Sequence, residues 1–142
     1  MKDLEKIASF IAEHHVMTLA TTDFDGVSAC SLFYAYDALT QTFVVASADD
    51  TTHVHHSKKN PNIAGNILLE TKSVGKIQGV QFRGSFAALD DASLRGLYFK
   101  AFPYALALTP KLWSIRVDYF KMTDNRLGFG KKIIWRREAD GV

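Results

Sequence analysis

The chain has 142 residues, of which 47% are hydrophobic and 23% charged, and its net charge is +2 with histidine neutral. This balance is typical of one folded domain with a sizeable core, so we exclude general disorder and expect a single domain over residues 1–142. The small net charge argues against a nucleic-acid partner, and no apolar run approaches the roughly 18 residues of a membrane span. A charged N-terminus without a signal-peptide pattern, together with the single cysteine Cys30, leads us to expect a cytoplasmic protein without an intrachain disulfide.

The first third of the chain predicts a helix followed by three strands. Asp3 can cap a helix over residues 3–14, in which apolar residues recur at helical spacing. Strands rich in β-branched and apolar residues follow at 16–22, 27–36 and 42–47. Asp25-Gly26 joins the first two strands as a hairpin, because glycine tolerates a positive φ.

The rest of the chain alternates short helices with longer strands. A short helix begins at Asp49-Asp50-Thr51-Thr52 and ends before Pro61, and a second helix follows Asp90-Asp91 and is broken by Pro103. We expect the remaining strands at 62–70, 77–89, 112–122 and 129–135.

Two of these strands carry further information. Gly79 and Gly84 interrupt one of them and indicate a bend or a close approach of two backbones. The strand at 112–122 alternates, so that one face should carry Trp113, Ile115, Val117 and Tyr119. About seven strands with a few short helices predict a mainly β protein, an antiparallel β-barrel, in preference to a doubly wound fold.

The stretch His53-Val54-His55-His56 is the first candidate for chemistry. His53 and His56 share one face of the expected helix, as two metal ligands would. The stretch has no acidic residue at a suitable spacing, and no HExxH pattern occurs. We therefore interpret it as a solvated helix face and expect no metal.

The second candidate is the segment that leads into this helix. A helix N-terminus presents free N–H groups and a partial positive charge, which suit a phosphate group. Three hydroxyls and one imidazole could add to it: Ser47, Thr51, Thr52 and His53. Plain helix capping is the alternative, and the residues alone favour it because Asp49 and Asp50 oppose an anion.

Polar residues also interrupt the strand at 77–89. Gln81 and Arg83 lie on the side opposite Val80 and Phe82, so they form either the exposed face of a half-buried strand or a ligand contact. Further along, Lys131 and Lys132 follow two glycines. This stretch lacks the spacing of a phosphate-binding Walker loop, but the two lysines can still meet an anion or a partner subunit.

Nucleophilic catalysis finds little support in the sequence. Cys30 has small neighbours in a strand, so we interpret it as a core residue. The chain has no GxSxG motif for a serine nucleophile and no GxGxxG motif for a dinucleotide.

The order of elements resembles a known superfamily. A strand at Thr18-Leu19-Ala20-Thr21, a turn at Gly26, Asn60-Pro61 after a short helix and a long strand ending at Gly84 resemble the pyridoxamine 5′-phosphate oxidase-like FMN-binding split barrels. Within that superfamily, one small bacterial family is similar in its Gly79–Gly84 and Thr123–Lys132 motifs and in Trp135.

The resemblance implies a six-stranded antiparallel split barrel, a homodimer and an FMN groove between the two subunits. In the superfamily, basic residues hold the FMN phosphate; the matching positions here are Thr52 and His53 in one element and Ala29 and Tyr34 in another. Because this chain departs from the oxidase at these positions, we do not expect true pyridoxamine 5′-phosphate oxidase activity. Hydroxyls and a helix N-terminus would have to replace the cations.

Two functions follow from the resemblance. The first is an FMN-binding, oxidoreductase-like dimer that acts on a small substrate, with Lys131 and Lys132 supplied by the opposite subunit. Its predicted cofactor-binding residues are Ser47, Thr51, Thr52, His53, Gln81, Lys131 and Lys132. The alternative is a non-catalytic small-ligand-binding or dimeric interaction protein of the same fold with a degenerate flavin site.

Overall fold

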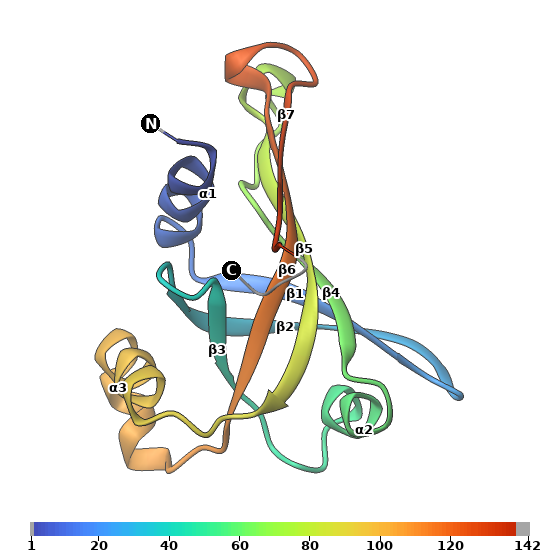
Figure 1. The fold of residues 1–142 in the computed structure, drawn as a ribbon, viewed down its shortest axis with the longest axis vertical. Coiled ribbons are helices and arrows are strands. Elements are labelled where there is room, and N and C mark those ends of the chain that lie inside the picture. Colours follow the sequence, from blue (N-terminus) through green and yellow to red (C-terminus); the bar gives the residue numbers. More distant parts are fainter. Residues whose placement is uncertain (1, 139–142) are drawn as a thin grey trace.

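Seven antiparallel strands form one sheet that closes on itself in the computed structural model, which describes residues 2–138 (Figure 1). The strands lie in the order β3-β2-β1-β4-β5-β6-β7, and β3 also pairs with β6. Their bounds are β1 Val16–Asp23, β2 Gly26–Asp37, β3 Thr42–Ala46, β4 Asn62–Leu68, β5 Gln78–Ala88, β6 Leu112–Asp124 and β7 Lys132–Arg136. Six strands therefore make the closed ring that the sequence led us to expect, and β7 is added outside it.

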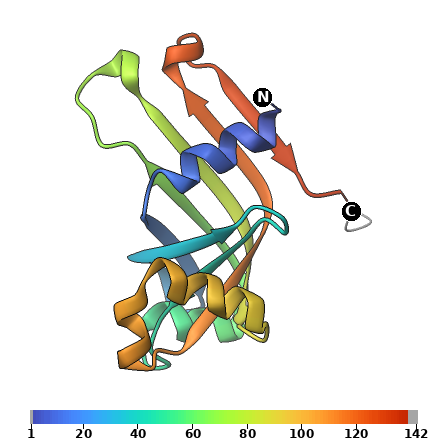
Figure 2. The same ribbon diagram turned by 90° about the vertical axis from the view of Figure 1, so that its left-hand side faces the viewer.

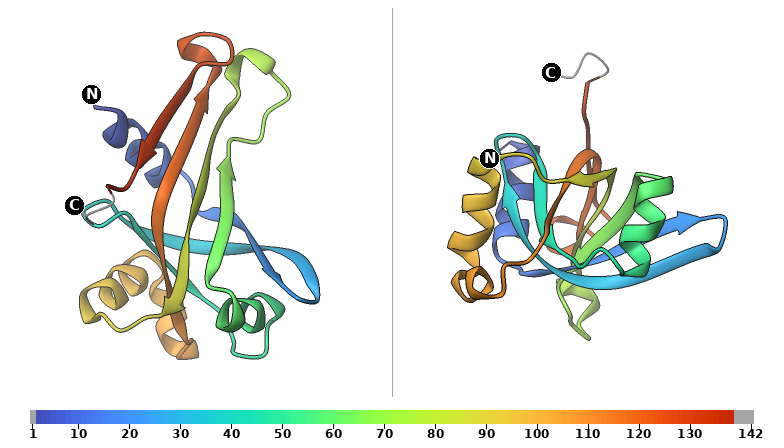
Figure 3. Two further views of the ribbon diagram at one scale, coloured as in Figure 1. Left: turned by 45° about the vertical axis from the view of Figure 1, so that its right-hand side comes forward. Right: turned by 90° about the horizontal axis from the view of Figure 1, so that it is seen from below.

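Strand β6 is divided between two partners along one of its edges. Its first half, residues 112–116, pairs with β3 and closes the ring, whereas residues 119–123 pair with β7. The other edge of β6 pairs with β5 along almost its whole length. The barrel is thus closed at the lower end in Figure 1 and in the left view of Figure 3, and split at the upper end.

The division of β6 coincides with a β-bulge. Arg83 of β5 pairs with Tyr119, but the next residue, Gly84, pairs with Val117, so Asp118 is the extra residue on β6. A Cβ atom at Gly84 would collide with the carbonyl oxygen of Arg116. The close backbone approach predicted at Gly84 is therefore confirmed, and glycine is required there because the partner strand leaves no space.

The bulge also corrects the expected alternation of β6. Trp113, Ile115 and Val117 are buried on the inner face as predicted, but Tyr119 is turned outward and Phe120 takes the inner position. An extra residue shifts the two-residue period of a strand by one, which exchanges its two faces. The prediction that Tyr119 shares a face with Val117 was therefore wrong.

Short helices cover the open parts of the barrel. Helix α1, Asp3–Ala12, buries Ile7, Phe10 and Ile11 at the split end and contacts β5 and β7 (Figure 2). Helix α2, Thr52–Lys59, packs on β1 at the other end, and α3, Ala92–Ala101, packs on β2 and β3. Three 3₁₀ turns complete the fold: η1 Val74–Lys76, η2 Pro103–Leu108 and η3 Asn125–Leu127. Among residues 2–138, no helix is long and apolar enough to cross a membrane.

The connection between β6 and β7 differs from the prediction. The expected turn at 123–125 lies partly within β6, and β7 begins at Lys132 instead of residue 129. Gly128 and Gly130 have φ angles of 140° and 74°, which interrupt an extended strand. Asp124 is buried and accepts hydrogen bonds from the backbone N–H and the guanidinium of Arg126, at 3.0 and 2.9 Å, so the loop is fastened to the end of β6.

Replacing Gly84 by alanine tests the bulge. Because the new methyl group would overlap the backbone of β6, we expect Gly84→Ala to lower the free energy of unfolding by at least about 1–3 kcal/mol. Gly96 lies in helix α3 with open space around its Cβ position, so Gly96→Ala is the matched control and should raise stability by up to about 1 kcal/mol. Urea denaturation measures both, and equal stability of the two variants would contradict the bulge.

Candidate functional site

The loop between β3 and α2 is anchored on the beginning of β6. The backbone N–H of Ser47 donates to the carbonyl oxygen of Lys111 at 3.1 Å, and the indole N–H of Trp113 donates to the carbonyl oxygen of Ser47 at 2.9 Å. Trp113 is itself buried and stacks on Phe86, with ring centroids 5.3 Å apart. The first turn of α2 is therefore held in place by the strand pair that closes the barrel.

Asp49 in this loop is neutralised by two lysines. Lys111 Nζ lies 2.9 Å from the carboxylate and Lys58 Nζ lies 3.4 Å from it. The hydrogen bond from Lys111, with that from Lys58 and the attraction of both charges, lowers the pKa of Asp49. The negative charge of Asp49, which in the sequence argued against an anion site, is therefore offset by the two lysines. Such exposed ion pairs contribute little to the stability of the fold.

The N-terminus of α2 has no side-chain cap within the described chain. Thr51 precedes the helix in an extended conformation and donates its hydroxyl to the carbonyl oxygen of Ala48 at 2.9 Å. Within the described part of the chain, no side chain caps the helix by accepting from its first turn. The N–H groups of Thr52, His53 and Val54 therefore have no intrahelical acceptor, and Thr52 is exposed beside them. An anion fits this position.

His53 faces inward and not toward solvent. Its side chain is only 8% exposed, its Nε2 lies 2.6 Å from Ser47 Oγ, and its ring meets Phe86 edge-on at 6.4 Å. Burial lowers the pKa of His53, so the imidazole is neutral at neutral pH. Ser47 and His53 are indeed neighbours, but they bind each other, and His53 offers no positive charge.

The histidine-rich stretch as a whole is not the solvated helix face that we expected. His55 is exposed, but His53 and His56 are buried against the barrel. His56 Nδ1 lies 3.0 Å from the hydroxyl of Thr21 on β1. Residues 2–138 contain no group of three or more side chains arranged to hold a metal ion.

The remaining predicted site residues lie elsewhere. Lys131 and Lys132 are exposed at the β6–β7 connection, at the end of the molecule opposite α2 (Figures 1 and 2). Within one chain they cannot reach the first turn of α2. Ala29 is exposed on β2, whereas Tyr34 is buried and donates its hydroxyl to the carbonyl oxygen of Ile11 at 2.6 Å. Neither position supplies a cation.

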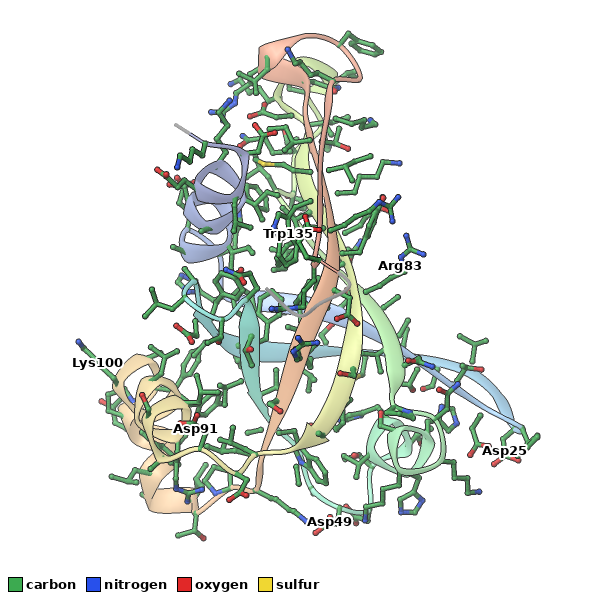
Figure 4. The ribbon with its side chains drawn as sticks, in the orientation of Figure 1. Asp25, Asp49, Arg83, Asp91, Lys100 and Trp135 are labelled. Atoms are coloured by element: carbon green, nitrogen blue, oxygen red, sulfur yellow. The ribbon has the colours of Figure 1, made fainter. Side chains whose placement is uncertain are left out.

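Gln81 lies in a hollow on the outer face of the sheet. The hollow has a volume of about 450 Å³ and crosses strands β1, β4, β5 and β6. It is lined by Thr18, Ala20, Ala64, Gly65, Asn66, Gln81, Phe82, Arg83, Tyr119 and Lys121. In Figure 4, Arg83 points to this side, away from α1. Arg83 and Gln81 were recognised as polar interruptions of a strand, but Tyr119 and Lys121 were missed because the bulge reverses the faces of β6.

Cys30 is half-buried and packs against the core, in keeping with its interpretation as a structural residue. Burial raises the pKa of its thiol. A thiol held in this form is a poor nucleophile, since the thiolate is the reactive species.

The buried His53 gives a test by pH. Because the pKa of His53 in the folded chain lies below the ordinary value of 6.5, the unfolded chain binds a proton at His53 at a higher pH than the folded chain does. Stability should therefore fall as the pH drops through 6.5 and continue to fall until the lowered pKa is passed. Thermal melts from pH 7.5 to 5.5 should show a shallower loss for His53→Gln than for the wild type, while His55→Gln, changed at an exposed position of the same helix, keeps the wild-type slope. An unchanged slope in His53→Gln would contradict a buried neutral imidazole.

Comparisons with known proteins agree with this fold. A family model described as pyridoxamine 5′-phosphate oxidase matches residues 4–112. A UPF0306 protein of Klebsiella pneumoniae (strain 342) is 37% identical over 142 residues, which cover 98% of this chain and 97% of the relative. One from Enterobacter sp. (strain 638) is 39% identical over 140 residues, covering 96% and 99%.

Two solved structures share the architecture at low sequence identity. A heme binding protein from Mycobacterium smegmatis superposes with a TM-score of 0.79 at 18% identity, covering 96% of this chain and 58% of that one. A FAD-binding protein from Mesorhizobium loti superposes with a TM-score of 0.71 at 14% identity, covering 86% and 92%. These two structures show the fold alone, whereas the family model over residues 4–112 and the relatives at 37% and 39% identity show that the chain belongs to the pyridoxamine 5′-phosphate oxidase family and to the bacterial UPF0306 proteins.

Proposed function

We propose that this protein is an FMN-binding, oxidoreductase-like homodimer that acts on a small substrate, with the FMN phosphate held at the first turn of α2. The observation that carries the proposal is the uncapped N-terminus of α2 beside a neutralised Asp49. The FAD-binding protein of the same fold supports a flavin as the ligand.

The groups at this turn fit a phosphate through hydrogen bonds more than through charge. Backbone N–H groups of the first turn and the hydroxyl of Thr52 are the donors, and the helix dipole adds a partial positive charge. Ser47 and His53 support the turn from beneath, since their side chains bind each other. Without an arginine fork the charge-assisted contribution is small, so we expect weaker FMN binding than in a site built on arginine.

Bound FMN would supply the hydride-transfer chemistry, which makes no demand for a catalytic acid or base from the protein. The residues of this chain then bind and orient the cofactor. Gln81 is the polar residue of β5 that we assign to the cofactor, from its place in the outer hollow.

A second subunit would complete the site. Lys131 and Lys132 lie too far from α2 to act within their own chain, and we propose that they reach the phosphate of the opposite subunit. Large apolar side chains exposed on a single chain support an interface: Val27, Phe33, Tyr104, Leu108, Phe129 and Ile134.

The alternative is a protein of the same fold that binds a small ligand or a partner without catalysis. The absence of a cation at Ala29 and Tyr34 and the neutral His53 favour it. An absorption spectrum of the purified protein separates the two: flavin bands support the proposal, and a colourless protein that binds no added FMN supports the alternative. A heme spectrum would place it with the heme binding neighbour instead.

Removing one N–H group tests the phosphate site directly. Thr52 is the first residue of α2 and follows Thr51, which has φ −75° and ψ 152°, a conformation that accepts a following proline. Thr52→Pro should leave the helix intact but delete one charge-assisted hydrogen bond, worth about 1.5–3 kcal/mol, and so weaken FMN binding about tenfold or more.

The control is Thr52→Ala, which keeps the N–H group and should weaken FMN binding less. Riboflavin, which lacks the phosphate, should bind both variants and the wild type equally. Calorimetric or fluorescence titrations measure all three proteins. Equal affinity of the wild type and Thr52→Pro for FMN would show that the phosphate does not bind at the first turn of α2.

The dimer is tested by light scattering and by charge removal. We expect a particle of twice the 15.8 kDa chain mass at micromolar concentration. Lys131→Gln/Lys132→Gln should weaken FMN binding, whereas Arg95→Gln/Lys100→Gln, which removes two exposed charges from α3, should not. A stable monomer that binds FMN with wild-type affinity after loss of both lysines would refute the contribution of a second subunit.

A further inference from the structure

We propose that the cavity between helix α1 and the split end of the barrel binds a small zwitterion with an apolar body, the chemistry of an aliphatic amino acid. The cavity has a volume of about 280 Å³ and is lined by α1, by strands β5, β6 and β7 and by the 3₁₀ turn η3. Figure 2 shows α1 crossing the strands of the split end. None of the lining residues is among those that we assign to FMN, so the inference goes beyond the flavin site.

Helix α1 presents one charge of each sign to the cavity. Four lining residues recur at the spacing of a single helix face: Lys6, Ser9, Phe10 and the cap residue Glu13. Across residues 2–138, neither Lys6 nor Glu13 has an oppositely charged side chain within 4.0 Å. The helix therefore offers an unpaired cation and an unpaired anion to one ligand.

The floor of the cavity is apolar. Met122 of β6 and Ile133 of β7 pair with each other, and both are buried together with Phe10. Leu127 of η3 is half-exposed and adds an apolar side wall. An aliphatic chain that lies on this floor leaves water, which favours binding.

Asp124 contributes a buried carboxylate with one acceptor position left. Its Oδ1 accepts from the backbone N–H and the Nε–H of Arg126 at 3.0 and 3.1 Å, and its Oδ2 accepts from Nη2 at 2.9 Å. A carboxylate has about four lone-pair positions, so Oδ2 can accept from one further donor. The hydrogen bond from Arg126 lowers the pKa of Asp124, and the ionised carboxylate attracts an amine.

Arg126 can bind the other end of the same ligand. A guanidinium has five N–H donors, and Asp124 takes one from Nε and one from Nη2. The remaining donors suit a carboxylate, for which a guanidinium is the strongest partner among side chains. Lys6 lines the same cavity and adds a second cation.

The charges of the lining balance one another. Two cations, Lys6 and Arg126, stand against two anions, Glu13 and Asp124. A zwitterion keeps this balance, whereas a ligand with a single charge would leave one side chain of the lining without a partner. The volume lies just below the range of roughly 300–1,000 Å³ that is typical of drug-sized ligands, so the cavity suits a smaller molecule such as an amino acid.

L-Leucine and two truncated forms test the ligand class. 3-Methylbutylamine is leucine without the carboxylate, and 4-methylpentanoate is leucine without the amine. We expect L-leucine to bind the wild-type protein about tenfold more tightly than either truncated form, because each of these loses hydrogen bonds to charged groups. Calorimetric titration measures all three ligands.

Two variants separate the two ends of the ligand. Glu13→Gln should weaken L-leucine and 3-methylbutylamine about tenfold and leave 4-methylpentanoate unchanged. Lys6→Gln should weaken L-leucine and 4-methylpentanoate and leave 3-methylbutylamine unchanged. The matched controls are Lys2→Gln and Glu5→Gln, which change exposed charges at the same helix outside the cavity and should bind L-leucine as the wild type does. Thermal melts check that every variant is folded.

The proposal is wrong if L-leucine does not bind, if Glu13→Gln and Lys6→Gln bind it with wild-type affinity, or if the control variants lose as much affinity. Equal affinity for L-leucine and its truncated forms would also overturn it, since the cavity would then recognise the apolar body alone. FMN affinity should be the same in all these variants and in the wild type. Failure of the flavin proposal and failure of this one are therefore distinguishable.

Discussion

The structure depends on the close approach of Gly84 to the backbone of β6. Because glycine has no Cβ, β5 can follow β6 past the extra residue Asp118. At this point β6 changes its edge partner from β3 to β7. The backbone N–H of Val117 donates to the carbonyl oxygen of Gln41 at 3.0 Å, and the backbone N–H of Arg137 donates to the carbonyl oxygen of Asp118 at 2.9 Å. The bulge therefore marks the boundary between the closed part of the barrel, where β6 pairs with β3, and the split part, where β6 pairs with β7.

Each half of β6 positions one candidate site. The half before the bulge pairs with β3, and Trp113 and the neighbouring Lys111 hold the loop before α2, so the position of the first turn of α2 is fixed. The half after the bulge turns Tyr119 and Lys121 to the outer face, where they meet Arg83 and Gln81. A straight, unbulged β6 would bury Tyr119 and remove Tyr119 and Lys121 from the lining of the outer hollow.

Local patterns in the sequence predicted most of the elements, since alternation, glycine, proline and capping residues act over a few positions. The features that the sequence did not predict depend on contacts between residues far apart in the chain. The collision that demands glycine at position 84 involves Arg116 on another strand, so the reversal of Tyr119 could not be read from β6 alone. Likewise, the polar stretch 52–59 looked solvated, but the end of the barrel covers one face of α2 and buries His53 and His56. Ser47 and His53 were predicted to lie together, yet their mutual hydrogen bond and the lowered pKa follow only from packing.

The central claim is that the uncapped first turn of α2 receives the phosphate of FMN. The most direct measurement follows the backbone amide resonances of isotope-labelled protein as FMN or riboflavin is added. The account predicts that the N–H protons of Thr52, His53 and Val54 shift downfield with FMN, as they gain an anionic acceptor, and that riboflavin leaves them in place. If FMN saturates the protein while these three resonances stay unchanged, the phosphate binds elsewhere and the account is wrong.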